Sequence, residues 1–237
     1  MAGLSLTVAN SVMANGFHWQ LQTGLTTSVH FQGNSQNLAM DNATMNQYTV
    51  STPAQTDAIL GAGIAYQWDH PDFATSLGLS LYHMNGSVSG INSPSITDGA
   101  YDTLNYQAKS NSLAFMLEPK IIWSAHAVQP YVLTGAGISF NHLEDYRESQ
   151  TVVGSSAVPT LTPFNSQTTP SFAYEAGIGV QYAIEETKNA LLLALDYRFM
   201  DWGNTGLAQY HGQPTSNTLN FGHLQTTSVN LSLSWPF

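Results

Sequence analysis

The sequence has little charge and no cysteine. Only 8% of its 237 residues are charged, with five Lys plus Arg against fifteen Asp plus Glu, whereas soluble domains carry about 25% charged residues. The absence of cysteine excludes disulfides, thiolate metal sites and cysteine nucleophiles. Nucleic-acid binding depends on basic patches, so a net charge of −10 argues against nucleic acid as a partner.

Long apolar runs are also missing. No stretch approaches the roughly 18 consecutive apolar residues of a transmembrane helix, yet the mean hydropathy is only −0.10. Ser, Thr, Asn, Gln and Gly stand in place of the missing charge, rather than Leu. This composition is typical of a chain with one face in lipid and one face that is wet.

The first residues differ in character from the rest. Residues 1–14 are apolar and small and end in Ser-Val-Met-Ala, which resembles the apolar region and cleavage site of a secretory signal without its basic flank. We expect residues 1–14 to be a signal-peptide remnant or a disordered N-terminus, and residues 15–237 to form one domain.

Alternation of apolar and polar residues, the sequence signal of a β-strand, recurs along the whole chain. From Phe17 to Phe31 the odd positions form an oily face, and His18 and His30 fall on the polar face. None of the oily positions in the eight segments of this kind is charged. The predicted strands are residues 17–31, 58–68, 73–81, 113–123, 132–140, 172–182, 191–199 and 227–237.

Two features favour a membrane barrel over a soluble β-sandwich. The polar faces carry Gly, Ser, Gln and Asn with few charges, whereas a sandwich face in water normally carries Lys and Glu. The connections alternate between short and long, as between periplasmic turns and extracellular loops. We therefore predict an all-β fold: an eight-stranded antiparallel transmembrane β-barrel with short periplasmic turns and four long extracellular loops.

Aromatic residues gather at both ends of the predicted strands, as interfacial girdles do. At the outer rim we expect Phe31, Phe140, Phe172 and Phe199. Pro119 cannot donate a ladder hydrogen bond, so we expect a bulge there. The predicted periplasmic girdle is Trp19, Trp68, Trp123, Tyr182 and Trp235.

The C-terminal residues 228–237 alternate and end in Phe. They resemble the β-signal that the outer-membrane assembly machinery recognises. With residues 131–141 and 195–199, they make the chain similar to the small Gram-negative barrels grouped with the OmpA transmembrane domain, OmpX and the opacity proteins. The resemblance implies a monomer in the bacterial outer membrane, surrounded by lipid and lipopolysaccharide, and says little of activity. The implied signal positions are Val229, Leu231, Leu233, Trp235 and Phe237.

Five charged residues fall at inward positions of the predicted strands. An unpaired charge in a narrow lumen is costly, whereas a hydrogen-bonded network is tolerated. The cluster is either a gate in a polar path or a salt-bridge plug. An eight-stranded interior is just wide enough for side chains to fill, which favours the plug. The residues are Glu118, Lys120, Glu175, Asp196 and Arg198.

No catalytic, cofactor or metal site is predicted. There is no His-x-Ser motif, and Asp69-His70 is interpreted as a turn. His18 and His30 lie too far apart to share a metal, and helical zinc spacings are absent. The acidic residues 144–148 are interpreted as a solvated loop.

Two functions from different classes remain open. The first is a non-enzymatic surface protein whose extracellular loops present binding surface for adhesion, for a host or surface ligand, or for envelope integrity. The alternative is a narrow channel for small solutes, with the narrow bore against it.

Overall fold

The chain forms β-strands almost throughout. The computed structural model describes residues 15–39, 45–51, 56–94, 103–123, 128–151, 164–184, 191–209 and 218–236; residues 1–14 and Phe237 lie outside them. No helix among the described residues is long and apolar enough to cross a membrane. The strands are β1 (Gly16–Phe31), β2 (Gln36–Ala39), β3 (Met45–Val50), β4 (Ala58–Asp69), β5 (Phe73–Pro94), β6 (Leu104–Trp123), β7 (Val128–Gln150), β8 (Phe164–Asn165), β9 (Gln167–Ala183), β10 (Leu192–Gln209) and β11 (Leu219–Pro236).

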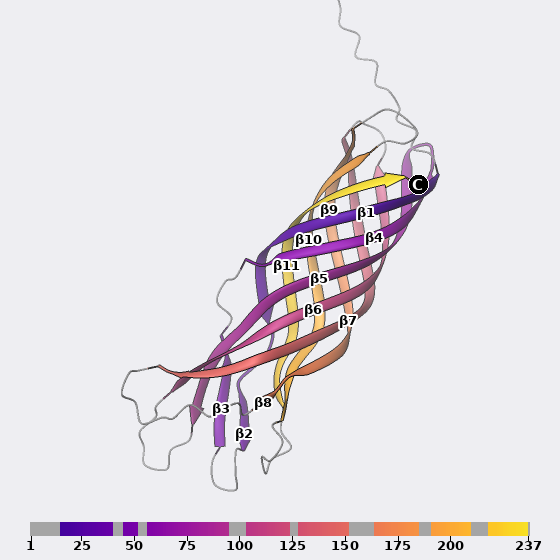
Figure 1. Ribbon diagram of the computed structural model, residues 1–237. Coiled ribbons are helices and arrows are strands. Elements are labelled where there is room, and N and C mark those ends of the chain that lie inside the picture. Colours follow the sequence, from indigo (N-terminus) through magenta and orange to yellow (C-terminus); the bar gives the residue numbers. More distant parts are fainter. Residues whose placement is uncertain are drawn as a thin grey trace, which may run out of the picture.

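Eight long strands close into a ring (Figure 1). Each pairs antiparallel with its neighbours in the order β1-β4-β5-β6-β7-β9-β10-β11. The last strand pairs with the first, from His18 opposite Pro236 to Phe31 opposite Leu224. Closure satisfies the backbone groups of both end strands, which lipid requires. The predicted eight-stranded barrel is confirmed.

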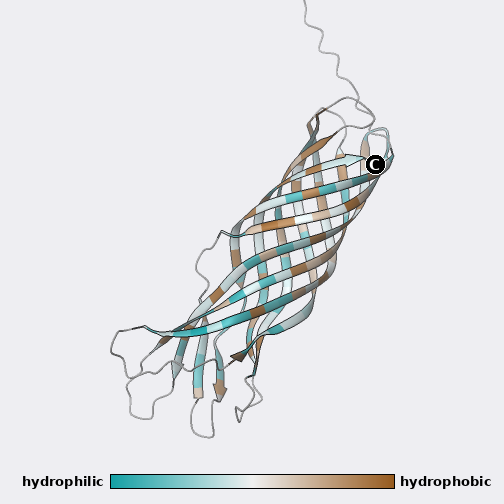
Figure 2. Cartoon of the chain, in the orientation of Figure 1, coloured by the Kyte–Doolittle hydropathy of each residue, from teal (hydrophilic) through white to brown (hydrophobic). Residues whose placement is uncertain are grey.

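Side-chain alternation divides the barrel into an oily outside and a filled inside. Leu21, Leu25, Leu60 and Leu79 each expose about half or more of their surface on the wall of alternating brown and teal residues in Figure 2. Their chain neighbours point inward, where Gln22 and Ser80 are buried. Apolar side chains facing out of a closed barrel form the belt that contacts lipid.

The outer end of β1 departs from the predicted register. Thr27 is an extra residue in a bulge, because Thr26 pairs with Ser228 and Ser28 with Thr227. The bulge inverts the alternation, so that Val29 and Phe31 are buried inside. Phe31 is therefore not part of an outer girdle. His30 is exposed on the outer face and does not point into the lumen as predicted.

The expectation of a bulge at Pro119 is wrong. Pro119 pairs with Leu77 in an unbroken β5–β6 register. On its other side the register with β7 is the same before and after it, with Leu117 opposite Ala136 and Lys120 opposite Leu133. Pro119 has no backbone N–H to donate, so one ladder hydrogen bond is missing, but the register of β6 with its neighbours does not change. The irregularity in β6 lies between Gln107 and Lys109, nearer the outer end.

Much of what the sequence predicts as loop is strand. β5 and β6 stay paired out to Asn92 opposite Leu104, and β6 and β7 out to Leu104 opposite Gln150. Beyond the outer ends of β1 and β4, β2 and β3 pair with each other, and β3 pairs with β5. The barrel wall thus continues past the belt, at the end opposite the C-terminus in Figure 1.

The register makes one residue a sharp test of the lipid-facing belt. Leu195 points outward on β10, is half exposed, and is flanked on the same face by the exposed belt residues Leu193 and Tyr197. We expect Leu195→Arg to lower the stability of the assembled barrel by about 2–4 kcal/mol, the cost of Arg at the bilayer midplane. The measurement is the urea midpoint in lipid vesicles. Leu195→Phe, which keeps the position apolar, is the matched control and should stay near wild type. Equal losses in both variants would mean that Leu195 is packed against protein.

Candidate functional site

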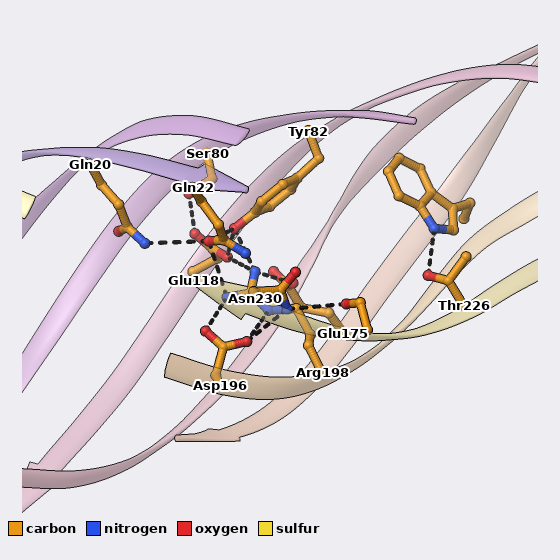
Figure 3. A network of polar contacts seen from close by, with 12 residues as sticks. Gln20, Gln22, Ser80, Tyr82, Glu118, Glu175, Asp196, Arg198, Thr226 and Asn230 are labelled. Carbon is orange, nitrogen blue, oxygen red and sulfur yellow. Dashed lines mark hydrogen bonds and ion pairs between the residues drawn. The ribbon is translucent and has the colours of Figure 1, made fainter. Parts of the chain in front are cut away.

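Arg198 of β10 lies at the centre of a buried polar network in the barrel interior (Figure 3). Its side chain is 4% exposed. Its Nη1 lies 3.0 Å from Glu175 Oε2 on β9 and 3.1 Å from Glu118 Oε1 on β6. Its Nη2 lies 3.2 Å from Asp196 Oδ2, two residues earlier on the same strand. One guanidinium therefore joins carboxylates from three strands.

Neutral side chains occupy the other positions around the guanidinium. Nη1 donates to the Tyr82 hydroxyl at 2.5 Å, and Nη2 donates to Gln22 Oε1 at 3.3 Å. The Tyr82 ring also lies 5.3 Å from the guanidinium carbon, within cation–π range. Gln22 is on β1 and Tyr82 on β5, so Arg198 reaches across the barrel. These contacts tie opposite walls together.

Each carboxylate also has donors of its own. Ser80 and Tyr82 donate to Glu118. Tyr131 donates to Asp196 Oδ2 at 2.9 Å, and the Asn230 amide donates to Oδ1 at 2.8 Å. Glu175 is the exception, because its Oε1 has no hydrogen-bond partner among the described residues. Charge-assisted hydrogen bonds are what make a buried carboxylate tolerable.

Lys120 stands at the edge of this network. Its Nζ lies 4.5 Å from the centre of the Tyr131 ring. Two cations, Arg198 and Lys120, therefore accompany the three carboxylates. The structure places all five predicted lumen charges inside the barrel and joins four of them through Arg198.

Apolar side chains fill the interior on the extracellular side of the network. Trp202, Met84 and Met116 are buried there, in a cluster that also contains Phe31 and Phe221. The indole of Trp202 donates to Thr226 Oγ1 at 3.0 Å, so its only polar atom is satisfied. Buried polar side chains lie in the same half of the interior: Ser112 Oγ and Asn141 Oδ1 have no hydrogen-bond partner among the described residues.

The periplasmic end of the interior is more polar. Gln181 donates to Gln129 at 3.0 Å, and Gln67 donates to Asp69 at 2.9 Å. Both ring nitrogens of the buried His18 have no partner among the described residues. Such groups are normally satisfied by water. Polar side chains therefore lie at both ends of the lumen, and the larger apolar cluster lies on the extracellular side of the network.

Several contributors to the network are not among the sequence-predicted residues: Gln22, Ser80, Tyr82, Tyr131 and Asn230. All five alternate inward on their strands, so their direction was readable from the pattern. Their contact with Arg198 or its carboxylates depends on the register between strands, which the pattern does not give.

The remaining predicted residues lie on the outer surface. Val229 and Leu231 are exposed, and Leu233 is partly exposed; with Trp235, their role in assembly stays a prediction, and Phe237 lies outside the described residues. The girdle role likewise stays a prediction. Its five members lie near the strand ends at the periplasmic rim: Trp19, Trp68, Trp123 and Tyr182, which are exposed, and Trp235, which is partly exposed.

Residues 144–148 belong to β7 and are not a solvated loop as predicted. Asp145 has φ of 54° in the bulge opposite Gln107 and Lys109. It forms an exposed ion pair with Lys109 at 2.6 Å. Asn92 donates to Glu148 Oε1 at 2.8 Å, and Tyr146 donates to the same oxygen at 2.7 Å. Among the described residues, no group of three or more His, Cys, Asp or Glu side chains could hold a metal ion.

Solved structures of small outer-membrane barrels are similar to this chain. Neisserial surface protein A (NspA) is 15% identical with a TM-score of 0.39, over 94% of this chain and 97% of that one. Ail, the attachment invasion locus protein of Yersinia pestis, solved with the heparin analogue sucrose octasulfate, is 9% identical with a TM-score of 0.35, over 92% and 99%. Neither a family model nor a curated protein sequence matches the chain.

The location of the chain follows from its own closed ring and apolar belt. Only helices and closed barrels satisfy their backbone groups in a bilayer, and barrels of this size with short turns at one end are built in outer membranes. The chain is an outer-membrane β-barrel.

Removing Arg198 tests whether its network holds the barrel together. We expect Arg198→Ala to lower the free energy of unfolding by about 3–5 kcal/mol, because buried carboxylates lose their shared cation. Adding Glu175→Gln should recover part of the loss, since Glu175 has the fewest other donors. The measurement is the urea midpoint of each variant in lipid vesicles.

The exposed Arg147 provides the matched control. Arg147→Ala should change the stability by no more than about 0.5 kcal/mol. Additive losses in the Arg198→Ala, Glu175→Gln double variant would show that the two side chains do not act as a pair.

Proposed function

We propose that this chain is a non-enzymatic outer-membrane surface protein: a closed barrel that holds a β-structured extracellular platform for binding a ligand at the cell or host surface. The observation that carries the proposal is that buried side chains fill the interior at two levels. The Arg198 network and the Trp202 layer occupy the lumen in series. A barrel filled in this way serves as an anchor, and the surface beyond it is what remains for function.

Aromatic side chains inside the extracellular platform continue the buried cluster that contains Trp202. Tyr106 stacks on Tyr146 with ring centroids 5.8 Å apart, and Phe164 meets Tyr146 edge-on at 5.1 Å. Tyr48 of β3 joins the same group, 6.0 Å from Tyr106. Such aromatic pairs add stability beyond the area they bury. The core fixes β3, β6, β7 and β8 relative to one another, which suits a preformed binding surface.

Charge indicates what kind of ligand the platform fits. The described residues at the extracellular end of the strands include five acidic side chains, Asp57, Glu144, Asp145, Glu148 and Asp201, and two basic ones, Lys109 and Arg147. Lys109 is already paired with Asp145. Opposite charges steer partners together and like charges repel. A sulfated polyanion such as the analogue bound to Ail is disfavoured, and a neutral or basic protein surface is favoured.

The channel alternative has one observation in its favour, the polar periplasmic half of the interior with its glutamines and His18. A conducting path would also have to cross the Trp202 layer, where buried apolar side chains replace the polar lining. Dry apolar constrictions are barriers to ions. The polar side chains at the periplasmic end therefore do not by themselves provide a path through the barrel.

Conductance tests the closed lumen directly. Wild-type protein in planar bilayers should show no steady conductance above the bare membrane, since the network and the apolar layer block the path in series. Arg198→Ala should remain closed, because the Trp202 layer is intact. A stable ohmic conductance of the wild type, altered in ion preference by Arg198→Ala, would replace the anchor with the channel.

Ligand binding tests the platform. Cells of a non-adherent Gram-negative strain displaying the protein should attach to immobilised basic matrix proteins and not to heparin. Replacing Glu144 by Gln together with Asp145 by Asn should weaken attachment several-fold, because surface charges mainly set association rates. Asp72→Asn, in the periplasmic turn, is the control. Attachment to heparin alone, or no attachment to any basic protein, would contradict the proposed ligand class.

A further inference from the structure

Four of the eight histidines point outward in the extracellular half of the barrel wall. His30 on β1, His83 on β5, His142 on β7 and His223 on β11 all lie on the outward face. On the outward faces of β5 and β7, His83 and His142 come two residues after the exposed Leu81 and Phe140. Each imidazole thus lies beyond exposed apolar residues of its own strand, with His83 nearest the belt because it pairs with Leu113, which in turn pairs with Phe140; we call the four the histidine girdle.

Pairing brings two of the four close together. Gln225 of β11 is opposite His30 of β1, and His223 is two residues further along β11. In the antiparallel ladder, residues diagonal in this way lie about 7–8 Å apart between Cα atoms. His30 and His223 therefore form one outward patch, on the wall where β1 closes the ring with β11.

The surroundings of His223 orient its ring. Its Nδ1 lies 3.0 and 3.1 Å from the two oxygens of Asp201, a carboxylate that is 1% exposed. The Gly203 amide and the Gln225 side chain also donate to Asp201, at 2.7 and 2.8 Å. The Asp201 contact takes up Nδ1, and the side chain of His223 is still 43% exposed. The Nε2 side of the ring therefore faces the surroundings of the barrel.

The other three imidazoles also meet the surroundings. The His142 side chain is 37% exposed, with Nδ1 at 2.9 Å from Thr168 Oγ1 and Nε2 at 3.5 Å from Glu144. His83 Nε2 lies 3.2 Å from the Asn85 amide. His30 is exposed. None of the four is packed into the core, so molecules that surround the barrel can reach all four rings.

The belt determines what lies at this level. Apolar side chains below the girdle contact hydrocarbon, so the girdle lies where lipid headgroups begin. Phosphate oxygens accept hydrogen bonds from N–H donors, and membrane proteins usually supply Lys and Arg for lipid phosphates. This chain has five Lys plus Arg in total. Two of them, Lys120 and Arg198, are inside the barrel.

We propose that the histidine girdle binds the phosphate groups of outer-leaflet lipid headgroups, such as phosphorylated glucosamine lipid. Imidazole N–H groups donate to phosphate oxygens, and Asp201 holds the His223 ring in the orientation that presents Nε2. The inference rests on the membrane placement of the barrel. It does not depend on the extracellular ligand or on the closed lumen. The lipid-binding inference and the proposed surface function can therefore fail separately.

The test compares two proteins and two lipids in neutral maltoside micelles. Wild type and a variant with His30→Gln, His83→Gln, His142→Gln and His223→Gln are titrated with bisphosphorylated lipid A or with its dephosphorylated form. The readout is the temperature midpoint of the heat-modifiable gel shift. Both proteins must show that shift before lipid is added, which establishes that each is folded.

Bisphosphorylated lipid A should raise the wild-type midpoint, and the variant should need roughly tenfold more lipid for the same rise, since each exposed contact is modest. Dephosphorylated lipid A should affect both proteins alike and less. His70→Gln, in the periplasmic turn, should match wild type. The proposal is overturned if the variant responds like wild type, or if phosphate removal makes no difference. An equal rise with inorganic phosphate would assign the site to a free ion and not to a lipid.

Discussion

The whole structure depends on one requirement: inside a bilayer, every backbone N–H and C=O must find a partner within the protein. β1 and β11 meet this requirement by pairing along the length of β1, from His18 to Phe31. Once the ring is closed, each strand has one face toward lipid and one toward a narrow interior. The low charge of the sequence follows from the first face. The small and neutral polar residues follow from the second.

Closure also determines how charge can exist inside. With little room for water, Arg198 can be buried only because carboxylates and neutral acceptors from several strands surround it, and each carboxylate needs its own donors. The contacts of Tyr82 and Gln22 extend the network from β10 to β5 and β1. The network therefore links distant parts of the wall that share no ladder hydrogen bonds. Above it Trp202 and its apolar neighbours pack together in the interior.

Alternation alone predicts the eight strands and their inward charges, because the spacing of two depends only on local geometry. The same pattern does not give the partners of Arg198, since those depend on strand register and barrel closure. It also predicts too little strand at the outer end. Segments such as residues 104–112 are polar on their outward side, yet they remain paired because Tyr106 and Ala108 are buried on the inward side.

His30 and Phe31, whose predicted sides of the wall were wrong, share a physical cause that also explains the bulges. Along β1 the odd-numbered positions are apolar or Thr both within the belt and beyond it, and on β10 and β11 the apolar residues Leu207, Leu219 and Phe221 again stand at odd positions beyond the belt. Outside the belt the surrounding solvent changes from lipid to water, so the apolar side must change from the outer face to the inner one. A single extra residue inverts the alternation while the ladder continues. β1 has Thr27 as its extra residue, β10 has Trp202, and β11 has Phe221.

Beyond each bulge the odd residues are buried: Val29 and Phe31 on β1, Leu207 on β10, and Leu219 and Phe221 on β11. The inversion on β1 also turns His30 outward, beside Gln225 and near His223. The bulges thus mark where the barrel leaves the hydrocarbon. The apolar seal within the interior and the polar rim outside it arise at the same level because both follow from that change of solvent.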